Sequence, residues 1–186
     1  MLEQHLVCFY ADDSGQQSRG RFLVVAGVAV SDHRANLKTA LERVESESDK
    51  RLRDWHSTTP NRRIKYLDLA CAVPELRGRI FYRICANSPA SQHSRVRADS
   101  IQAAIHVFAN KNRRAIHYEG LTRSNRDSLF YELRRRGLRS EVRAAPFSTY
   151  PEVRLADSLA AMIAKVHFST DGPDYAHLMR DWFVEL

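Results

Sequence analysis

The sequence of 186 residues contains few cysteines and no long apolar run. Its three cysteines, Cys8, Cys71 and Cys85, lie far apart and form no C-x-x-C pair, which argues against a zinc site or a disulfide framework. Each is expected to be a small buried hydrophobic residue in a reducing compartment. No apolar stretch approaches the roughly 18–20 residues of a membrane-spanning helix, and the N-terminus carries Glu3 rather than the basic segment of a secretion signal. These absences predict a cytoplasmic protein that does not enter a membrane.

Glycine-rich nucleotide-binding motifs are also missing. The chain has no Walker A loop and no G-x-G-x-x-G, so nothing supports a nucleotide-cofactor enzyme. Ser14 is a conceivable nucleophile, but the sequence positions no His–Asp pair to activate it. Internal repeats, low-complexity segments and linkers are absent as well, and the length suits one domain of roughly 100–200 residues. We therefore expect residues 1–186 to form a single domain.

Positive charge is concentrated in one part of the chain. The net charge is +7, and the segment 111–143 holds ten Lys and Arg against four acidic residues, a local net of +6. A contiguous basic segment of this kind suits the phosphate backbone of a nucleic acid. The alternative is a general abundance of arginine, since the chain has 24 Arg and only 5 Lys.

Hydrophobic patterns alternate between strand and helix periods. They predict strands at residues 5–11, 21–30, 79–86, 113–119 and 138–144. They predict helices at residues 31–53, 60–73, 95–111, 124–136, 152–168 and 175–183. The first two strands are close enough to form an N-terminal hairpin, and two helices are inserted before the third strand. This order predicts an α/β fold with a mixed sheet flanked by helices.

Acidic residues follow two of the predicted strands. Asp12 and Asp13 come directly after the first strand, and Glu119 ends the strand at 113–119. Open α/β sheets bind ligands at the carboxyl ends of their strands, and neighbouring strands lie only about 4.8 Å apart. Successive side chains of a strand point to opposite faces, so Asp12 is the favoured ligand of the pair. Each acid also has a simpler interpretation, as a turn residue or the start of a loop.

A third acid, Asp157, lies in the apolar helix at 152–168. Ala160, Ala161 and Ala164 follow it at helical spacing, and these small residues would let the helix lie close to the sheet. A carboxylate held there is costly unless it is paired or bound to a metal. Mg²⁺ and Mn²⁺ are hard cations that prefer carboxylate oxygens. The alternatives are that Asp157 caps the helix or pairs with Arg154.

The segment DWHST at residues 54–58 is a further candidate. Its Trp55 stands beside His56 in a polar stretch. His56 could bind a metal, move a proton or steady a leaving group. The alternative is that Trp55 packs beneath a long loop and His56 is simply exposed.

Several segments resemble the bacterial and phage family called domain of unknown function 3800. FYADDSG looks like the family's Y-x-D-E-S-G opening, IHYEGLTRSNRDSLFYELRRRG like its acid-ended strand and basic helix, and VRLADSLAAMIA like its final helix. The resemblance covers about residues 5–168 and implies a ribonuclease H-like fold with a metal-binding acidic cluster. By this resemblance Asp12, Glu119 and Asp157 are the cluster acids. Asp13 stands where the family usually has Glu, and His56 where many members have Lys.

These observations lead to the hypothesis of a nuclease dependent on Mg²⁺ or Mn²⁺. Asp12, Glu119 and Asp157 would form an acidic site for one or two metal ions and carry the chemistry, with Asp13 as an auxiliary ligand. His56 would be the general acid or an outer-shell partner of the metal. The nucleic-acid backbone would be held by four arginines of the basic helix: Arg123, Arg126, Arg134 and Arg135. The alternative is a non-catalytic nucleic-acid or protein interaction module on the same fold. A metal-dependent phosphatase is a third, weaker option.

Overall fold

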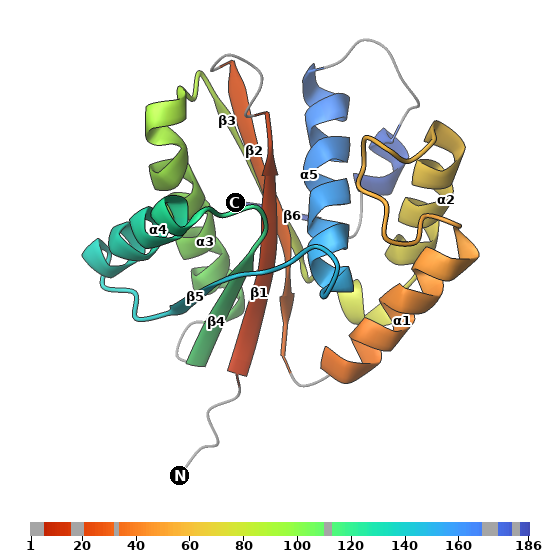
Figure 1. The fold of residues 1–186 in the computed structure, drawn as a ribbon, viewed down its shortest axis with the longest axis horizontal. Coiled ribbons are helices and arrows are strands. Elements are labelled where there is room, and N and C mark those ends of the chain that lie inside the picture. The colour runs from red at the N-terminus through yellow and green to blue at the C-terminus, as the bar shows by residue number, and fades with distance from the viewer. Residues whose placement is uncertain (1–5, 16–20, 32–33, 110–112, 169–174, 180–182) are drawn as a thin grey trace.

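A mixed sheet of six strands forms the centre of the computed structural model (Figure 1). The structure describes residues 6–15, 21–31, 34–109, 113–168, 175–179 and 183–186. The strands are β1 (Leu6–Ser14), β2 (Phe22–Val30), β3 (Ile80–Ala86), β4 (Arg113–Tyr118), β5 (Glu141–Ala144) and β6 (Phe183–Glu185). Their order across the sheet is β5-β4-β1-β2-β3-β6. The N-terminal hairpin is confirmed, because β1 pairs antiparallel with β2.

Strand β1 lies between two strands, of which one is close to it in the sequence and the other is far from it. It pairs with β2 on one side and runs parallel to β4 on the other, with Ala11 opposite Tyr118. The pairing with β2 continues to Ser14, which faces Val24. Asp12 and Asp13 therefore belong to the strand and not to the turn that follows it, because they keep their ladder partners on β2.

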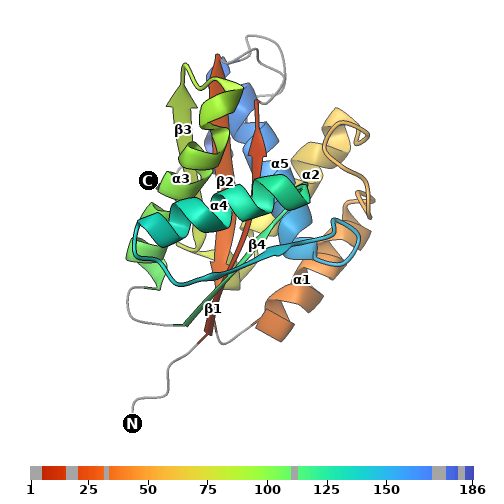
Figure 2. The ribbon, with the colours of Figure 1, turned by 60° about the vertical axis from the view of Figure 1, so that its left-hand side comes forward.

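In the described part of the chain, five α-helices cover the two faces of the sheet. They are α1 (Arg34–Glu47), α2 (Pro60–Cys71), α3 (His93–Phe108), α4 (Arg123–Arg135) and α5 (Pro151–Phe168), with short 3₁₀ helices at Pro74–Leu76, Ala90–Gln92 and Ala176–Met179. Helices α1, α2 and α5 lie on one face, here called the α5 side, and α3 and α4 lie on the other, the α3 side (Figure 1). Figure 2 shows α4 crossing in front of the sheet on the α3 side.

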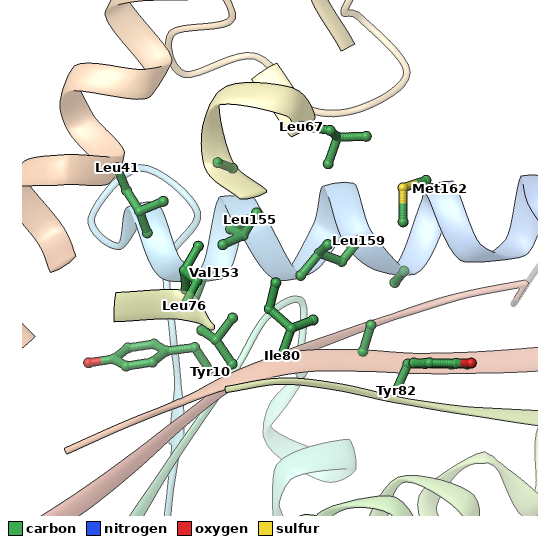
Figure 3. Packing of buried hydrophobic residues seen from close by; sticks show 14 of the residues in the cluster. Tyr10, Leu41, Leu67, Leu76, Ile80, Tyr82, Val153, Leu155, Leu159 and Met162 are labelled. Atoms are coloured by element: carbon green, nitrogen blue, oxygen red, sulfur yellow. The ribbon is translucent and has the colours of Figure 1, made fainter. Parts of the chain in front are cut away.

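Helix α5 is the main contact of the sheet on its side. Leu155, Leu159 and Met162 project from it into a layer bounded by Ile80 of β3 and Leu67 of α2 (Figure 3). All five side chains are buried. Because α5 is apolar on most of its circumference, it can pack against the sheet and α2 at once. A polar group on the packed part of α5, such as Asp157, is therefore held in a largely apolar setting.

The first inserted helix is shorter than predicted. It ends at Glu47 rather than near residue 53. The Ser48 hydroxyl donates to the Val44 carbonyl at 2.7 Å, and Asp49 then takes a φ of 55°, a left-handed conformation that stops the helix. The polar sequence of residues 45–54 predicts a segment that extends into solvent, but Lys50 within it is completely buried.

Two further details differ from what the sequence predicts, which is a capping-box-like start at Ser124-x-x-Asp127 with Phe130 and Leu133 on the buried side of the helix. Helix α4 is capped by Thr122, whose hydroxyl accepts from the Asn125 amide at 3.2 Å, and not by Ser124. Its buried residues are Leu129 and Leu133, whereas Phe130 is 40% exposed. The predicted helix at 175–183 is instead a 3₁₀ turn and the short strand β6, because the segment pairs with β3 at the edge of the sheet.

None of the helices in the described residues has both the length and the apolar character needed to cross a bilayer. All three cysteines are free thiols, with Cys8 and Cys71 buried and Cys85 half-buried.

Candidate active site

Asp12 and Glu119 lie side by side at the carboxyl ends of two adjacent parallel strands. The Glu119 amide donates to the Ala11 carbonyl at 3.1 Å, which continues the β1–β4 ladder by one residue. Tyr118 packs on the α3 side, so the alternation of the chain turns Glu119 toward the α5 side, where Asp12 also points. The two carboxyl groups form a side-chain hydrogen bond. The assumption that these strands are neighbours is therefore confirmed.

Helix α5 brings Asp157 to the same place. Its Oδ2 accepts from the Trp55 amide at 3.1 Å, which ties the helix to the segment before α2. The negative charge of Asp157 acts on both Asp12 and Glu119 and raises their pKa values. Asp157, Asp12 and Glu119 are hereafter called the acidic triad. Arg154, the alternative partner of Asp157, instead forms a buried bidentate pair with Glu45 at 2.6 and 2.8 Å.

Burial and mutual repulsion disfavour ionisation of the acidic triad. The pKa of Asp12 lies well above its usual range, because of burial first and then the charges of Asp13, Glu119 and Asp157. Burial and the Asp157 charge raise the pKa of Glu119 to about 7. Burial also raises the pKa of Asp157, and the nearby Lys50 partly offsets this effect. The site therefore concentrates carboxyl groups that would be stabilised in their charged form by a cation.

The carboxylate oxygens of the acidic triad are chemically suited to bind a hard divalent cation. Three carboxylates converge in a half-buried position, and Mg²⁺ and Mn²⁺ prefer such oxygen ligands. Within the described parts of the chain, no three His, Cys, Asp or Glu side chains already stand close enough together to hold an ion. Side-chain rearrangement of the acidic triad would therefore have to accompany metal binding.

Asp13 lies on the opposite face from the acidic triad. Its carboxylate accepts from Arg97 Nε at 2.7 Å and Nη2 at 3.0 Å, and from the Tyr118 hydroxyl at 2.9 Å. The Asp13 and Arg97 side chains are only 1% and 7% exposed. These contacts fix the end of β1 to α3 and β4, and they occupy both oxygens of Asp13.

His56 is exposed on the segment that lines Asp157. The preceding Trp55 is buried against Tyr175, with ring centroids 5.7 Å apart, and Arg63 lies 4.7 Å above the Trp55 ring. The His56 charge acts on Asp157 and on Asp54. The structure therefore places His56 within electrostatic reach of Asp157, and both halves of the alternative interpretation, a packed tryptophan and an exposed histidine, also hold.

Lys50 is a charged residue near the site that the sequence did not single out. Its ammonium donates to the Arg53 carbonyl at 2.7 Å and lies 4.8 Å above the Tyr66 ring. Its charge acts on Asp157 and Glu119, and burial lowers its pKa to about 8. In the sequence, Lys50 is distinguished only by its residue type, since the chain has 5 Lys among its 29 basic residues.

The four candidate nucleic-acid-binding arginines spread along α4. Arg123 stands four residues after Glu119, and with Ser91 and Ser94 it lines an open groove of about 810 Å³ on the α3 side. Arg134 stacks on Phe130 at 5.4 Å, and Arg135 and Arg126 pair with acids of their own helix. Arg134 lies about 16 Å further along the helix axis than Arg123, because an α-helix rises about 1.5 Å per residue. Of the four arginines, Arg123 is thus the closest to Glu119 along the chain.

No protein-family model and no curated protein matches the chain. Among solved structures, the chain is similar to ribonuclease HII in the structure of the complex of PCNA and ribonuclease HII from Archaeoglobus fulgidus. The TM-score is 0.53 and the sequence identity is 18%, over 91% of this chain and 82% of that one. The likeness, together with the six-stranded mixed sheet, shows a ribonuclease H-like fold and confirms the predicted fold class.

Proposed function

We propose that this protein is a nuclease that hydrolyses phosphodiester bonds in nucleic acid with the help of Mg²⁺ or Mn²⁺. The observation that carries the proposal is the convergence of Asp12, Glu119 and Asp157 from three separate elements onto one edge of a ribonuclease H-like sheet. The proposal includes kinship with the family named above and a cytoplasmic location. The likeness to a ribonuclease HII supports the fold, and the acidic triad supports the chemistry.

The acidic triad would hold the metal ion. The ion would supply positive charge against the phosphate oxygens and would lower the pKa of the attacking water. Asp13 would serve the site indirectly, since its ion pair with Arg97 fixes the end of the strand that carries Asp12. The hydrogen bond from the Trp55 amide would hold Asp157 in orientation.

Two further side chains would act on protons and charge. His56, exposed beside Asp157, would donate a proton to the leaving oxygen. Lys50, buried behind Asp157, would offset part of the negative charge of the acidic triad. The arginines of α4 would hold the backbone of the nucleic acid, beginning with Arg123, which follows Glu119 by four residues.

The test is a cleavage assay on labelled single- and double-stranded DNA and RNA with Mg²⁺, Mn²⁺ or EDTA. We expect metal-dependent cleavage of at least one substrate, and a loss of about 100-fold or more in Asp12→Asn, because removing a carboxylate that holds the metal removes transition-state stabilisation. The matched control is Glu42→Gln, which removes a half-exposed carboxylate on α1 that pairs only with Lys38 in the described structure. Cleavage by Asp12→Asn at the wild-type rate would remove Asp12 from the mechanism.

A non-catalytic nucleic-acid-binding module is the second candidate. It is favoured by the finding that, among the residues described, the carboxylates are not already arranged around an ion position. Such a module would bind nucleic acid in EDTA with strong salt dependence. The absence of cleavage of every substrate in the panel, together with such binding, would decide for it.

A further inference from the structure

A second candidate site lies at the opposite end of β1 and β4 from the acidic triad. A pocket of about 320 Å³ is lined there by four arginines from different parts of the fold: Arg34 of α1, Arg114 of β4, Arg139 before β5 and Arg143 of β5. In Figure 1 this is the lower end of β1 and β4, near the start of α1. One carboxylate, Glu141, also lines the pocket and pairs with Arg143 at 2.7 Å. Four guanidinium groups against one carboxylate give the lining a net charge of +3.

The side chain of Arg34 packs against aromatic rings. Its guanidinium lies 5.5 Å from the ring centroid of Tyr10 and 5.9 Å from that of Tyr150. Tyr10 stacks on His117 at 4.8 Å with an interplanar angle of 20°. Such stacking limits the freedom of a guanidinium, so less entropy is lost when it binds a ligand. Arg34 is therefore positioned before any ligand arrives.

His117 supplies an independent observation that points to a ligand. It lines the pocket and is 1% exposed, yet neither of its ring nitrogens has a hydrogen-bond partner among the residues that the structure describes. Buried polar side-chain atoms are nearly always paired, because leaving one unpaired costs about 1–3 kcal/mol. An acceptor-rich ligand in the pocket would give His117 a partner.

We propose that this pocket, here called the arginine pocket, binds a phosphate group. Planar guanidinium groups match phosphate oxygens in pairs of hydrogen bonds, and arginine is the residue of choice for this recognition. The volume of about 320 Å³ lies at the lower end of the range for small-ligand sites, which suits a phosphate carrying at most one nucleoside. The proposal does not rest on the nuclease activity proposed above.

The phosphate could belong to a free nucleotide or to a nucleic-acid strand that also reaches the acidic triad. Cys8 lines the arginine pocket, and Asp12 lies four residues further along the same face of β1. At about 3.3 Å per residue this is a separation of about 13 Å. It corresponds to the rise of about four nucleotides in one strand of a duplex at 3.4 Å each.

The experiment is titration of the full chain with inorganic phosphate and with AMP in EDTA, followed by calorimetry and by the NMR signals of the His117 ring. We expect binding with a shift of these signals, and at least a tenfold loss of affinity in Arg139→Gln/Arg143→Gln. The control is Arg43→Gln/Arg51→Gln, which removes two guanidinium groups that are 79% and 73% exposed and lie outside the arginine pocket. If the double variant is unfolded by circular dichroism, Arg139→Gln alone replaces it, with an expected loss of at least threefold.

A second arm distinguishes the two phosphate sources. Affinity for a 20-nucleotide single strand is measured in EDTA with the same variants. A parallel loss for phosphate and for the oligonucleotide identifies a backbone phosphate as the ligand, and a loss for phosphate or AMP alone identifies a free nucleotide. No binding of phosphate or AMP by the wild type, or equal losses in the control variant, would overturn the proposal. Neither readout depends on cleavage, so the outcome is independent of whether the acidic triad is active.

Discussion

At the scale of single residues, the adjacent aspartates of β1 occupy opposite electrostatic environments. Asp12 faces two other carboxyl groups on the α5 side, which raise its pKa together with burial. Asp13 faces Arg97 and Tyr118 on the α3 side and is fully paired by them. Successive side chains of a strand point to opposite faces. The charge of Asp12 therefore destabilises the fold, whereas the charge of its neighbour Asp13 stabilises it.

This difference predicts opposite effects of the same substitution on stability. Asp13→Asn should destabilise the protein by about 3 kcal/mol, because it leaves Arg97 as a buried charge without its ion-pair partner. Asp12→Asn should stabilise it in EDTA, because it removes a buried carboxylate that neighbouring carboxylates repel. The sign follows because a folded-state pKa raised above the unfolded value makes ionisation at neutral pH costly to the folded state.

The measurement is urea unfolding of both variants and the wild type at neutral pH in EDTA. Asn keeps the Oδ1 acceptor that binds the Asp13 amide at 2.7 Å in the wild type, so the Asp12 variant retains that contact. Equal destabilisation of the two variants would contradict the assignment of different environments.

The candidate site could be predicted from the sequence as far as its acids have recognisable positions. Asp12 and Glu119 follow apolar strands, and Asp157 interrupts an apolar helix, so pattern alone marked them. Lys50 could not be found in this way, because it lies in a polar segment and is buried only through the tertiary contacts of Tyr66 and Phe147.

At the scale of elements, Gly27 determines how closely β2 can approach its neighbours. A Cβ added at this position would overlap the Tyr10 carbonyl oxygen and would lie 2.7 Å from the Phe81 ring. Both neighbours are completely buried within the sheet and cannot move away without disturbing it. The absence of a side chain at Gly27 therefore permits the central three strands to pack as they do.

Gly27→Ala should consequently destabilise the fold by about 3 kcal/mol, at the upper end of the range for overpacking a core. The matched substitution is Gly78→Ala, where an added Cβ meets nothing within 4 Å and only the φ of 62° is unfavourable. It should cost about 1 kcal/mol, the usual cost of a left-handed conformation for a residue with a Cβ. Both values are measured by urea unfolding, and a smaller effect at Gly27 than at Gly78 would contradict the packing argument.

Element positions were predictable where a segment is a long, nearly continuous run of apolar residues that the fold buries. The core strands β1 to β4 and helix α5 are of this kind, and the sequence located all of them. Strand β6 was missed because its three residues form a strand only by pairing with β3, which is far away in the sequence. Phe130 was assigned to the buried side of α4 because an aromatic residue suggests burial, whereas Leu129 and Leu133 fill that space.

At the scale of the whole molecule, the basic residues of the segment 111–143 that the structure describes lie in two separate regions. One is the exposed helix α4 on the α3 side, and the other is the arginine pocket at the starting ends of β1 and β4. The sequence showed these as one basic segment from 111 to 143, because the chain order does not reveal that β4 and α4 face different ends of the sheet. Charge along the chain thus predicted a nucleic-acid partner but could not divide the basic residues between two surfaces.

The proposed contact between α4 and nucleic acid predicts a change in salt dependence. Arg134→Gln/Arg135→Gln should reduce the slope of log affinity against log salt by about 1.5, because two phosphate contacts account for roughly 0.7–0.9 each. The measurement is fluorescence anisotropy with labelled single- and double-stranded oligonucleotides in EDTA at several salt concentrations. Arg43→Gln/Arg51→Gln serves as the charge-matched control, and an equal change in slope for both variants would show that only net charge matters.

The arrangement of β1 between β2 and β4 also has a consequence for the order of folding. Strands β1 and β2 are joined by a short connection, whereas the contact of Asp13 with Tyr118 spans 105 residues and that of Trp55 with Asp157 spans 102. Closing long loops is entropically slower than forming a hairpin, so the β1–β2 hairpin is favoured to form first and β3, β4 and α5 to dock onto it later. The acidic triad is then complete only when the last layers have docked, so partly folded chains would not possess the site at all.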